Sequence, residues 1–249
     1  MTEIEKIFNN LLAFSGKIGT VFMLAPLILA FINRKSLNSI LKKFQIFCLF
    51  AFLIALLFQG TILLVDNFHN TFVPLLNKWE IHDMNFMSIL AYLNHFGLLG
   101  WYFSIVIPNI RVAKIVKWVS IFLFCAAIIN YLFIEGFRVY GIFNPTASAI
   151  FCFTLPLIHL WYLFNEDNKV PLTKNSYFWF SMGLLIPNMI GFFLHFAGEK
   201  IYGTDFILFC KISIGKCIFS IIGQILLAIG FYYSRYTKYL PKNTPSVIK

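Results

Sequence analysis

The sequence predicts an all-α fold, a bundle of seven transmembrane helices with the N-terminus outside and the C-terminus in the cytoplasm. Seven apolar stretches follow one another, each close to the roughly 20 residues that a helix needs to cross a hydrocarbon core about 30 Å thick. Apolar residues make up 59% and charged residues 12% of the 249 residues, whereas soluble domains carry about 45–50% and 25%. The charges between the stretches are sorted by sign, which predicts the orientation.

The predicted spans, in chain order, are residues 14–32, 46–65, 86–107, 118–134, 148–164, 177–197 and 207–233. The longest gap, 66–85, is too short for a folded domain with its own core. We therefore expect a single transmembrane domain, 1–249, that ends in a basic cytoplasmic tail, 234–249. Residues 1–13 lack the basic region that opens a signal peptide, so no cleavage is expected.

Lysine and arginine in short loops favour the cytoplasmic side of a membrane. Most of the 20 basic residues lie in alternate gaps and in the tail: Arg34, Lys35, Lys42, Lys43, Arg111, Lys114, Lys117, Lys169, Lys174, Arg235, Lys238, Lys242 and Lys249. The acids lie chiefly in the other gaps: Glu3, Glu5, Asp66, Glu80, Asp83, Glu135, Glu199 and Asp205. This sorting predicts a multi-pass protein of the inner (cytoplasmic) membrane, and the resemblance described below implies that the membrane is bacterial. The net charge of +10 then comes mostly from basic residues at the cytoplasmic surface of the lipid bilayer. No nucleic-acid partner is expected.

The five cysteines all fall inside apolar stretches and show no CxxC spacing. They are therefore predicted to be small buried hydrophobes, with neither a disulfide framework nor a zinc site. His69, His82 and His195 could meet at the outer face as a weak metal site, but loop histidines are usually solvated. No metal and no cofactor is predicted.

Polar residues inside the spans are informative, because hydrocarbon tolerates them only when they face the interior of a bundle. One helical stripe of the sixth span contains Ser181, Leu184, Asn188, Gly191, His195 and Gly198, and one of the seventh contains Lys216, Ser220, Gly223, Leu227, Gly230 and Ser234. Pro187 is expected to kink the sixth helix beside Asn188.

Depth along the helices places several of these side chains in the outer half of the bundle. The candidates for the wall of an outward-open pocket are Gln59, Asn94, His95, Asn130, Asn188, His195 and Lys216. No predicted span contains an Asp or Glu that could neutralise Lys216, so the hypothesis is a small anionic or amphiphilic ligand. Two alternatives stay open. The small and polar residues, His159 included, serve only as contacts between helices, or Lys216 snorkels to the outer interface.

Missing residues argue against several known chemistries. The third span has no acid to act as counter-ion to a retinal Schiff base at Lys216, and the seventh has no histidine, as seven-helix zinc hydrolases require. No GxSxG, Walker A, dinucleotide-binding or HExxH motif occurs. The Pro-Asn pairs at 108–109 and 187–188 do not repeat as they would in the seven-helix sugar carriers.

Three short segments resemble a group of uncharacterised seven-helix integral membrane proteins of Bacteroidota-type bacteria: residues 92–95 (YLNH), 171–191 and 221–231. The resemblance extends over about residues 14–237. It implies a signalling or accessory role, because such proteins tend to accompany sensor kinases. Relatives often carry a glutamate shortly after the histidine of the third span, which is His95 here. Residues 97–101 (GLLGW) contain no acid, which weakens the case for a proton-relay or catalytic role.

The sequence favours a sensor or signalling partner. A ligand in the periplasmic half would bias the sixth and seventh helices, and a protein partner at the cytoplasmic face would receive the change. Two other classes stay open: an intramembrane enzyme or transporter for a lipid-like or small anionic substrate, with His95 and His195 as acid or base, and a structural subunit without a ligand. No catalytic residue is assigned.

Overall fold

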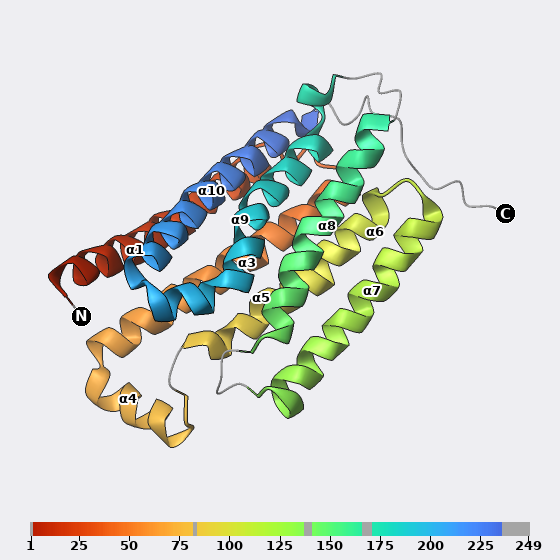
Figure 1. The fold of residues 1–249 in the computed structure, drawn as a ribbon. Coiled ribbons are helices and arrows are strands. Elements are labelled where there is room, and N and C mark those ends of the chain that lie inside the picture. The colour runs from red at the N-terminus through yellow and green to blue at the C-terminus, as the bar shows by residue number, and fades with distance from the viewer. Residues whose placement is uncertain (1, 82–83, 137–140, 166–170, 236–249) are drawn as a thin grey trace.

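The computed structural model describes residues 2–81, 84–136, 141–165 and 171–235, without the side chains of 84–85 and 192–200. Every element in this part of the chain is a helix. Figure 1 shows long helices that run side by side, with short connections at the two ends of the bundle. The predicted all-α fold is confirmed.

The first apolar segment forms two consecutive helices, α1 (Glu3–Phe22) and α2 (Leu24–Ile32), separated at Met23. The helix begins at a capping box, in which Thr2 and Glu5 bond to each other's backbone N–H groups. The break follows from Pro26, which lacks a backbone N–H and whose ring would collide with the carbonyl of Phe22, four residues earlier.

The second span, α3 (Ser39–Asn67), begins at Asn38, whose side-chain oxygen accepts a hydrogen bond of 2.8 Å from Leu41 N. Because this cap precedes the basic residues, Lys43 lies on the helix, with its ammonium 4.2 Å from the centre of the Trp101 ring. The gap after α3 contains a short helix, α4 (His69–Lys78).

The third and fourth spans each contain a π-helical turn. The third consists of α5 (Ser88–Asn94), η2 (His95–Leu99) and α6 (Gly100–Val106), after a 3-10 turn, η1 (Met84–Met87). The fourth consists of α7 (Ile110–Ile129) and η3 (Asn130–Ile134). Asn109 caps α7 by accepting from Arg111 N at 3.0 Å. The helix therefore starts about two turns before the predicted span.

The last three long helices are α8 (Phe143–Asn165), α9 (Ser176–Thr204) and α10 (Phe206–Tyr232), with a 3-10 turn, η4 (Leu172–Lys174), before α9. Asn175 caps α9 and Asp205 caps α10 through their side-chain oxygens. Prolines lie inside two of these helices, Pro156 in α8 and Pro187 in α9.

Alternate connections meet at the same end of the bundle. At one end, Asn38 donates a 3.0 Å hydrogen bond to the Tyr177 hydroxyl at the start of α9. At the other, the Tyr131 hydroxyl donates to the Phe86 carbonyl at 2.6 Å. We call the first end, with connections 33–38, 107–109 and 171–175, the basic end, and the second, with the N-terminus and α4, the acidic end (Figure 1). The half of the bundle nearest each end takes the same name.

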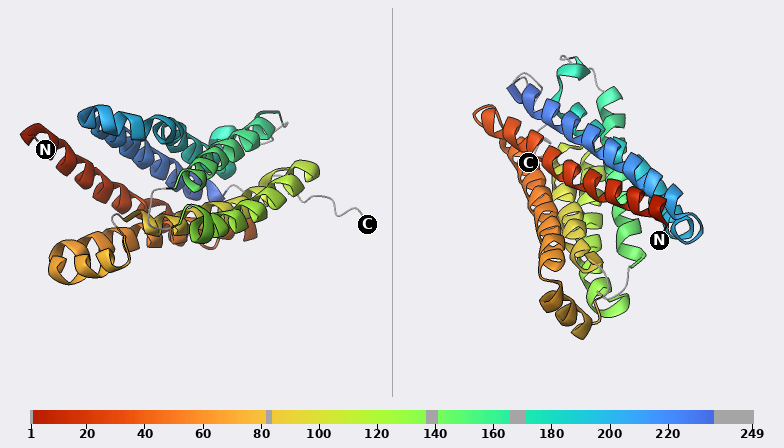
Figure 2. Two further views of the ribbon diagram at one scale, coloured as in Figure 1. Left: turned by 60° about the horizontal axis from the view of Figure 1, so that its bottom comes forward. Right: turned by 90° about the vertical axis from the view of Figure 1, so that its left-hand side faces the viewer.

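The long helices form two layers. α9 lies between α8 and α10, and α1 and α2 pack on α10. α3, the α5–η2–α6 helix and α7 form the second layer, and α8 contacts both. Figure 2 shows the layers crossing at an angle, so that α1 and the α9–α10 hairpin point away from α4 at the acidic end.

Within the described residues, six helices are long and apolar enough to cross a membrane: Glu3–Ile32, Ser39–Asn67, Ser88–Val106, Ile110–Ile134, Phe143–Asn165 and Phe206–Arg235. The chain is therefore a multi-pass membrane protein, as predicted. α9 has 29 residues, the same length as α3. Its side chains 192–200 are not described, and a seventh crossing stays a prediction.

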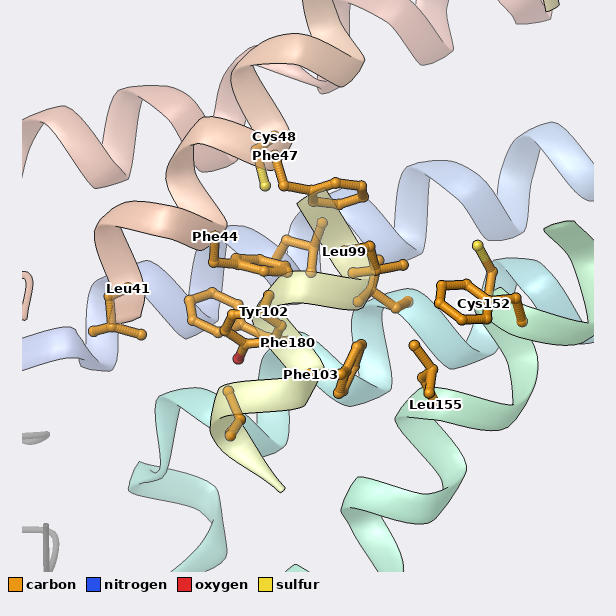
Figure 3. Close-up of a cluster of buried hydrophobic side chains, with 14 of the residues drawn as sticks. Leu41, Phe44, Phe47, Cys48, Leu99, Tyr102, Phe103, Cys152, Leu155 and Phe180 are labelled. Atoms are coloured by element: carbon orange, nitrogen blue, oxygen red, sulfur yellow. The ribbon is translucent and has the colours of Figure 1, made fainter. Parts of the chain in front are cut away.

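Aromatic rings from four helices build a core in the basic half (Figure 3). The centre of the Phe44 ring lies 4.3 Å from that of Phe180, 4.7 Å from Tyr102 and 6.0 Å from Phe231. All four side chains are fully buried. Lipid tails are as apolar as these rings, so close van der Waals contact, rather than removal from water, holds the core together in a bilayer.

Helices α9 and α10 cross at two glycines. A Cβ on Gly223 would lie 2.6 Å from the Gly183 carbonyl oxygen and 3.0 Å from the Pro187 ring. A Cβ on Gly183 would lie 2.8 Å from the Gly223 carbonyl oxygen, and one on Gly230 would lie 2.5 Å from the Phe180 ring. Small residues thus let the two backbones approach closely, as at many helix contacts in membranes.

Candidate functional site

His95 pairs with α8 near the centre of the bundle. Its Nδ1 lies 2.7 Å from Ser148 Oγ, and its ring centre lies 6.3 Å from that of Phe47. His95 is half-buried and Ser148 is buried. An imidazole on a serine hydroxyl is the arrangement that activates a nucleophile. Here the hydroxyl is shielded, so in this conformation the pair links two helices.

Two buried asparagines lie beside this pair, and each uses its side-chain nitrogen to bond a neighbouring helix. Asn94 donates from Nδ2 to the Phe47 carbonyl at 3.4 Å, and Asn144 donates to the Ala127 carbonyl at 3.2 Å. Within the part of the chain that the structure describes, the Oδ1 atoms of both accept no hydrogen bond. An unsatisfied buried acceptor costs about 1–3 kcal/mol, so each favours a water or another donor beside it.

Both π-helical turns begin at a predicted pocket residue, η2 at His95 and η3 at Asn130. Such turns are rare and occur frequently at functional sites. At η2 the wider turn presents the Phe96 carbonyl to α7, where Ser120 donates its hydroxyl hydrogen to it. Gly100, the first residue of α6, lies directly against Ser120, so the third span and α7 are in close contact there.

Asn130 is tied to the connection between α7 and α8. Its Nδ2 donates to Glu135 Oε2 at 2.6 Å, and Glu135 Oε1 accepts from the backbone N–H groups of Ile142 and Phe143, each at 3.0 Å. Partial burial acts to raise the pKa of Glu135, but the bonds from Asn130, Phe143 and Ile142 outweigh it and lower that pKa. The carboxylate sits at the start of α8, where the helix dipole favours negative charge.

Lys216 lies against α9. A Cβ on Gly191 would be 3.6 Å from Lys216 Cε, so the lysine stem crosses the α9 backbone at that glycine. The side chain is half-buried. Asn188, about one turn along α9, donates from Nδ2 to the Leu184 carbonyl of its own helix at 2.7 Å. The predicted partner His195 belongs to α9, but its side chain lies outside the described residues.

The predicted pocket residues line different helix contacts. Gln59 of α3 points toward α1, because a Cβ on Gly16 would lie 3.8 Å from its Nε2. The candidates thus form three groups. Asn94, His95 and Asn130 lie around η2, η3 and α8. Asn188 and Lys216 lie between α9 and α10, and Gln59 lies between α3 and α1. The main neighbours of α10 are α9, α1 and α2. A single pocket that joins the groups stays a prediction.

A second histidine pair lies near the basic end. His159 Nδ1 is 2.7 Å from Ser181 Oγ, and both residues are buried. The rings of Phe103 and Tyr177 meet the imidazole edge-on, with centres 5.8 and 6.4 Å away. This is an interhelical hydrogen bond between α8 and α9, the role that the sequence favours for His159.

Ser148, Asn144 and Glu135 were not predicted as site residues. Ser148 and Asn144 lie four residues apart and therefore share one face of α8, which is the signal that could have found them. Glu135 directly follows the predicted fourth span. Its bond to Asn130 depends on the π-helical turn, which the sequence did not predict.

Among the residues that the structure describes, no group of three His, Cys, Asp or Glu side chains could hold a metal ion. Comparisons with family models, with curated proteins and with solved structures find no match. The functional argument therefore rests on the arrangement of the side chains.

Proposed function

We propose that this chain is a seven-span sensor of the bacterial inner membrane, with its basic end in the cytoplasm. A small amphiphilic anion enters from the outer side and binds Lys216 at the contact between α9 and α10. The basic end passes the resulting change to a partner protein.

The orientation rests on the charges at the two ends. Arg34, Lys35 and Lys174 lie on connections of the basic end, whereas Glu3 and Glu5 open α1 at the acidic end. Basic residues in short loops are retained in the cytoplasm. The 29 residues of α9 extend about 43 Å, and α9 packs between α8 and α10, which supports a seventh crossing.

The observation that carries the proposal is the direction of the Lys216 side chain. The stem lies on α9 at Gly191, and within the described residues its ammonium makes no hydrogen bond or ion pair. A cation in hydrocarbon is stable only beside a partner, and the predicted spans contain no Asp or Glu. A ligand carboxylate or phosphate would supply the missing charge, and its apolar tail would lie among the helices.

The contact between α9 and α10 offers a route from this position to the basic end. It continues from Gly191 through the crossing of Gly183 and Gly223 to Phe180, which packs on Phe44 in the aromatic core. A ligand that binds two arrangements of this contact with different affinity would shift their populations.

Binding of dodecanoate tests the ligand site. Wild-type protein in lipid nanodiscs is expected to bind it saturably in isothermal titration calorimetry, and Lys216→Met is expected to bind it roughly 10- to 100-fold more weakly, because a hydrogen bond to a charged group contributes about 1.5–3 kcal/mol. Lys211→Met is the matched control, since Lys211 is exposed on the same helix near Phe8. Equal affinity of the two variants, or no binding by the wild type, would refute the proposal.

Thiol accessibility tests the orientation separately. In a background without native cysteines, Asn70→Cys on α4 and Lys35→Cys before α3 are treated with a membrane-impermeant maleimide in intact cells. Both positions are exposed. We expect labelling at position 70 only, and labelling at position 35 would reverse the orientation.

A further inference from the structure

An apolar groove of about 400 Å³ separates α7 from α8. Its lining comes from these two helices alone: Ile115, Val116, Val119, Leu123, Ala147, Ile150, Phe151, Thr154, Leu155 and Ile158. The lining is hydrocarbon apart from the Thr154 hydroxyl, and it belongs to two helices that can cross a membrane. The groove therefore faces the lipid and not water.

The groove has a fixed floor and open walls. Val116, Phe151 and Leu155 form the floor and are buried, whereas Ile115 and Ile150 on the walls are exposed. The floor is anchored beneath, because Phe151 packs edge-on against Phe96 of η2, with ring centres 5.5 Å apart. The groove is thus held open by the contacts of α7 and α8 with the helix between them.

The dimensions of the groove match one lipid chain. From Ile115 to Leu123 on α7 the lining extends about 12 Å, and from Ala147 to Ile158 on α8 it extends about 16 Å. One leaflet of a hydrocarbon core about 30 Å thick measures about 15 Å. A helix 10–12 Å in diameter would fill about 1,000 Å³ over the same length, which is more than twice the volume available.

The charges at the mouth of the groove indicate which lipid fits. Arg111 lies one turn before Ile115 on the same face of α7, and Lys114 adjoins Ile115. Both are exposed, and neither forms an ion pair within the described residues. Trp118 of α7 and Trp161 of α8 are exposed near this level, as is typical of the membrane interface.

We propose that the groove between α7 and α8 binds one acyl chain of an anionic phospholipid from the leaflet at the basic end, with Arg111 and Lys114 at its phosphate. This site is lined by α7 and α8, whereas Lys216 of α10 lies against α9, so it is independent of the ligand proposed above.

Native mass spectrometry of protein extracted from nanodiscs of equal phosphatidylglycerol and phosphatidylcholine tests the site. The wild type is expected to retain a phosphatidylglycerol molecule after partial delipidation. Val119→Trp, which fills the groove, is expected to lose it, and Ile121→Trp, an exposed position of the same helix outside the groove, is expected to keep it. Equal retention by both variants would overturn the proposal.

Two further variants keep the test decisive. Thr154→Phe fills the groove from α8 and is expected to lose the same lipid, so it decides the result if Val119→Trp does not fold. Arg111→Gln is expected to reduce the preference for phosphatidylglycerol about fivefold, because a cation near an anionic surface contributes about 1 kcal/mol. Arg34→Gln, at the same end, serves as its control.

A second copy of the chain is the competing occupant. If Val119→Trp converts a dimer to a monomer and leaves the number of retained lipids unchanged, the groove is a protein contact and the proposal is wrong. If the wild type retains phosphatidylcholine as often as phosphatidylglycerol, the assignment of an anionic headgroup is wrong.

Discussion

The basic and acidic halves of the bundle are built from the same helices but are held together differently. Along α3 every buried side chain lies in the first third: Leu41, Phe44, Phe47 and Cys48. The remainder of α3 and the whole of α1 contain no buried residue within the described part of the chain. The contrast teaches that, along α1 and α3, buried packing is concentrated in the basic half and the acidic half is packed less densely.

The two histidine pairs show the same contrast. His159 and Ser181 are both buried beneath aromatic rings in the basic half. His95 is half-buried, and the side-chain oxygen of the neighbouring Asn94 accepts no hydrogen bond from the described residues. Local stability varies across a protein, and binding regions come from its less stable parts. This difference supports the ligand site proposed above at Lys216, which lies in the acidic half of α10.

The largest expected effect comes from the centre of the aromatic core. Phe44→Ala is expected to lower the free energy of unfolding by about 3–5 kcal/mol, because it leaves a cavity among tightly packed rings. Leu57→Ala, on the lipid-facing side of the same helix, is expected to change it by less than about 0.5 kcal/mol. Unfolding in bicelles by a denaturing detergent measures both. Equal losses would remove the distinction between the halves.

The glycine crossing comes next in size. Gly223→Ala is expected to cost about 1–3 kcal/mol, because its methyl group would overlap the Gly183 carbonyl and push α9 from α10. Gly215→Ala, on the same helix with open space around its Cβ, is expected to be neutral or stabilising by up to about 1 kcal/mol. The same unfolding assay compares them, and a milder result for Gly223→Ala would show that the crossing can adjust.

A smaller effect is expected in the acidic half. Ser148→Ala removes the hydrogen bond to His95 and is expected to cost about 1 kcal/mol. Ser104→Ala is the control and is expected to change the stability little, since within the described residues that hydroxyl bonds to the Trp101 carbonyl of its own helix. A loss for Ser148→Ala that equals the loss for Phe44→Ala would contradict the softer packing assigned to this half.

The smallest effect is a dependence on pH at the acidic end. Glu135 has a pKa below its ordinary value of 4.5 in the folded protein. Its stabilisation is therefore fully present above about pH 4.5 and is lost as pH falls through the lower, folded value. The melting temperature of the wild type is expected to fall more between pH 6 and pH 3 than that of Glu135→Gln. An equal fall in both would exclude this carboxylate as a contributor.

Six of the seven predicted spans correspond to helices long and apolar enough to cross a membrane, because hydropathy is the main requirement for a segment that lies in a bilayer. Their starts were not predictable to the same degree. α3 and α7 begin at the caps Asn38 and Asn109 and continue through basic residues. A hydropathy window excludes those residues, although the stems of Lys and Arg can lie along a helix while their charges reach water.

For the candidate pocket residues, the spacing along each helix predicts a depth but not the direction in which the side chain points. Residue spacing places Gln59, His95 and Lys216 at comparable depths, yet they face α1, α8 and α9 respectively. Which neighbour a side chain meets depends on how the layers are arranged, and the π-helical turns at His95 and Asn130 further rotate the side chains beyond them on the same helix. No local pattern in one sequence records those rotations.

The lengths of the helices have a mechanical consequence. α3 and α9 contain 29 residues each, about 43 Å of helix for a hydrocarbon core of about 30 Å. Excess length is accommodated by tilt or by local thickening of the bilayer. Figure 2 shows that the two layers of helices cross at an angle. We therefore expect a thinner membrane to increase the tilt of these helices and a thicker one to reduce it, which would couple the spread of the layers at the acidic end to bilayer thickness.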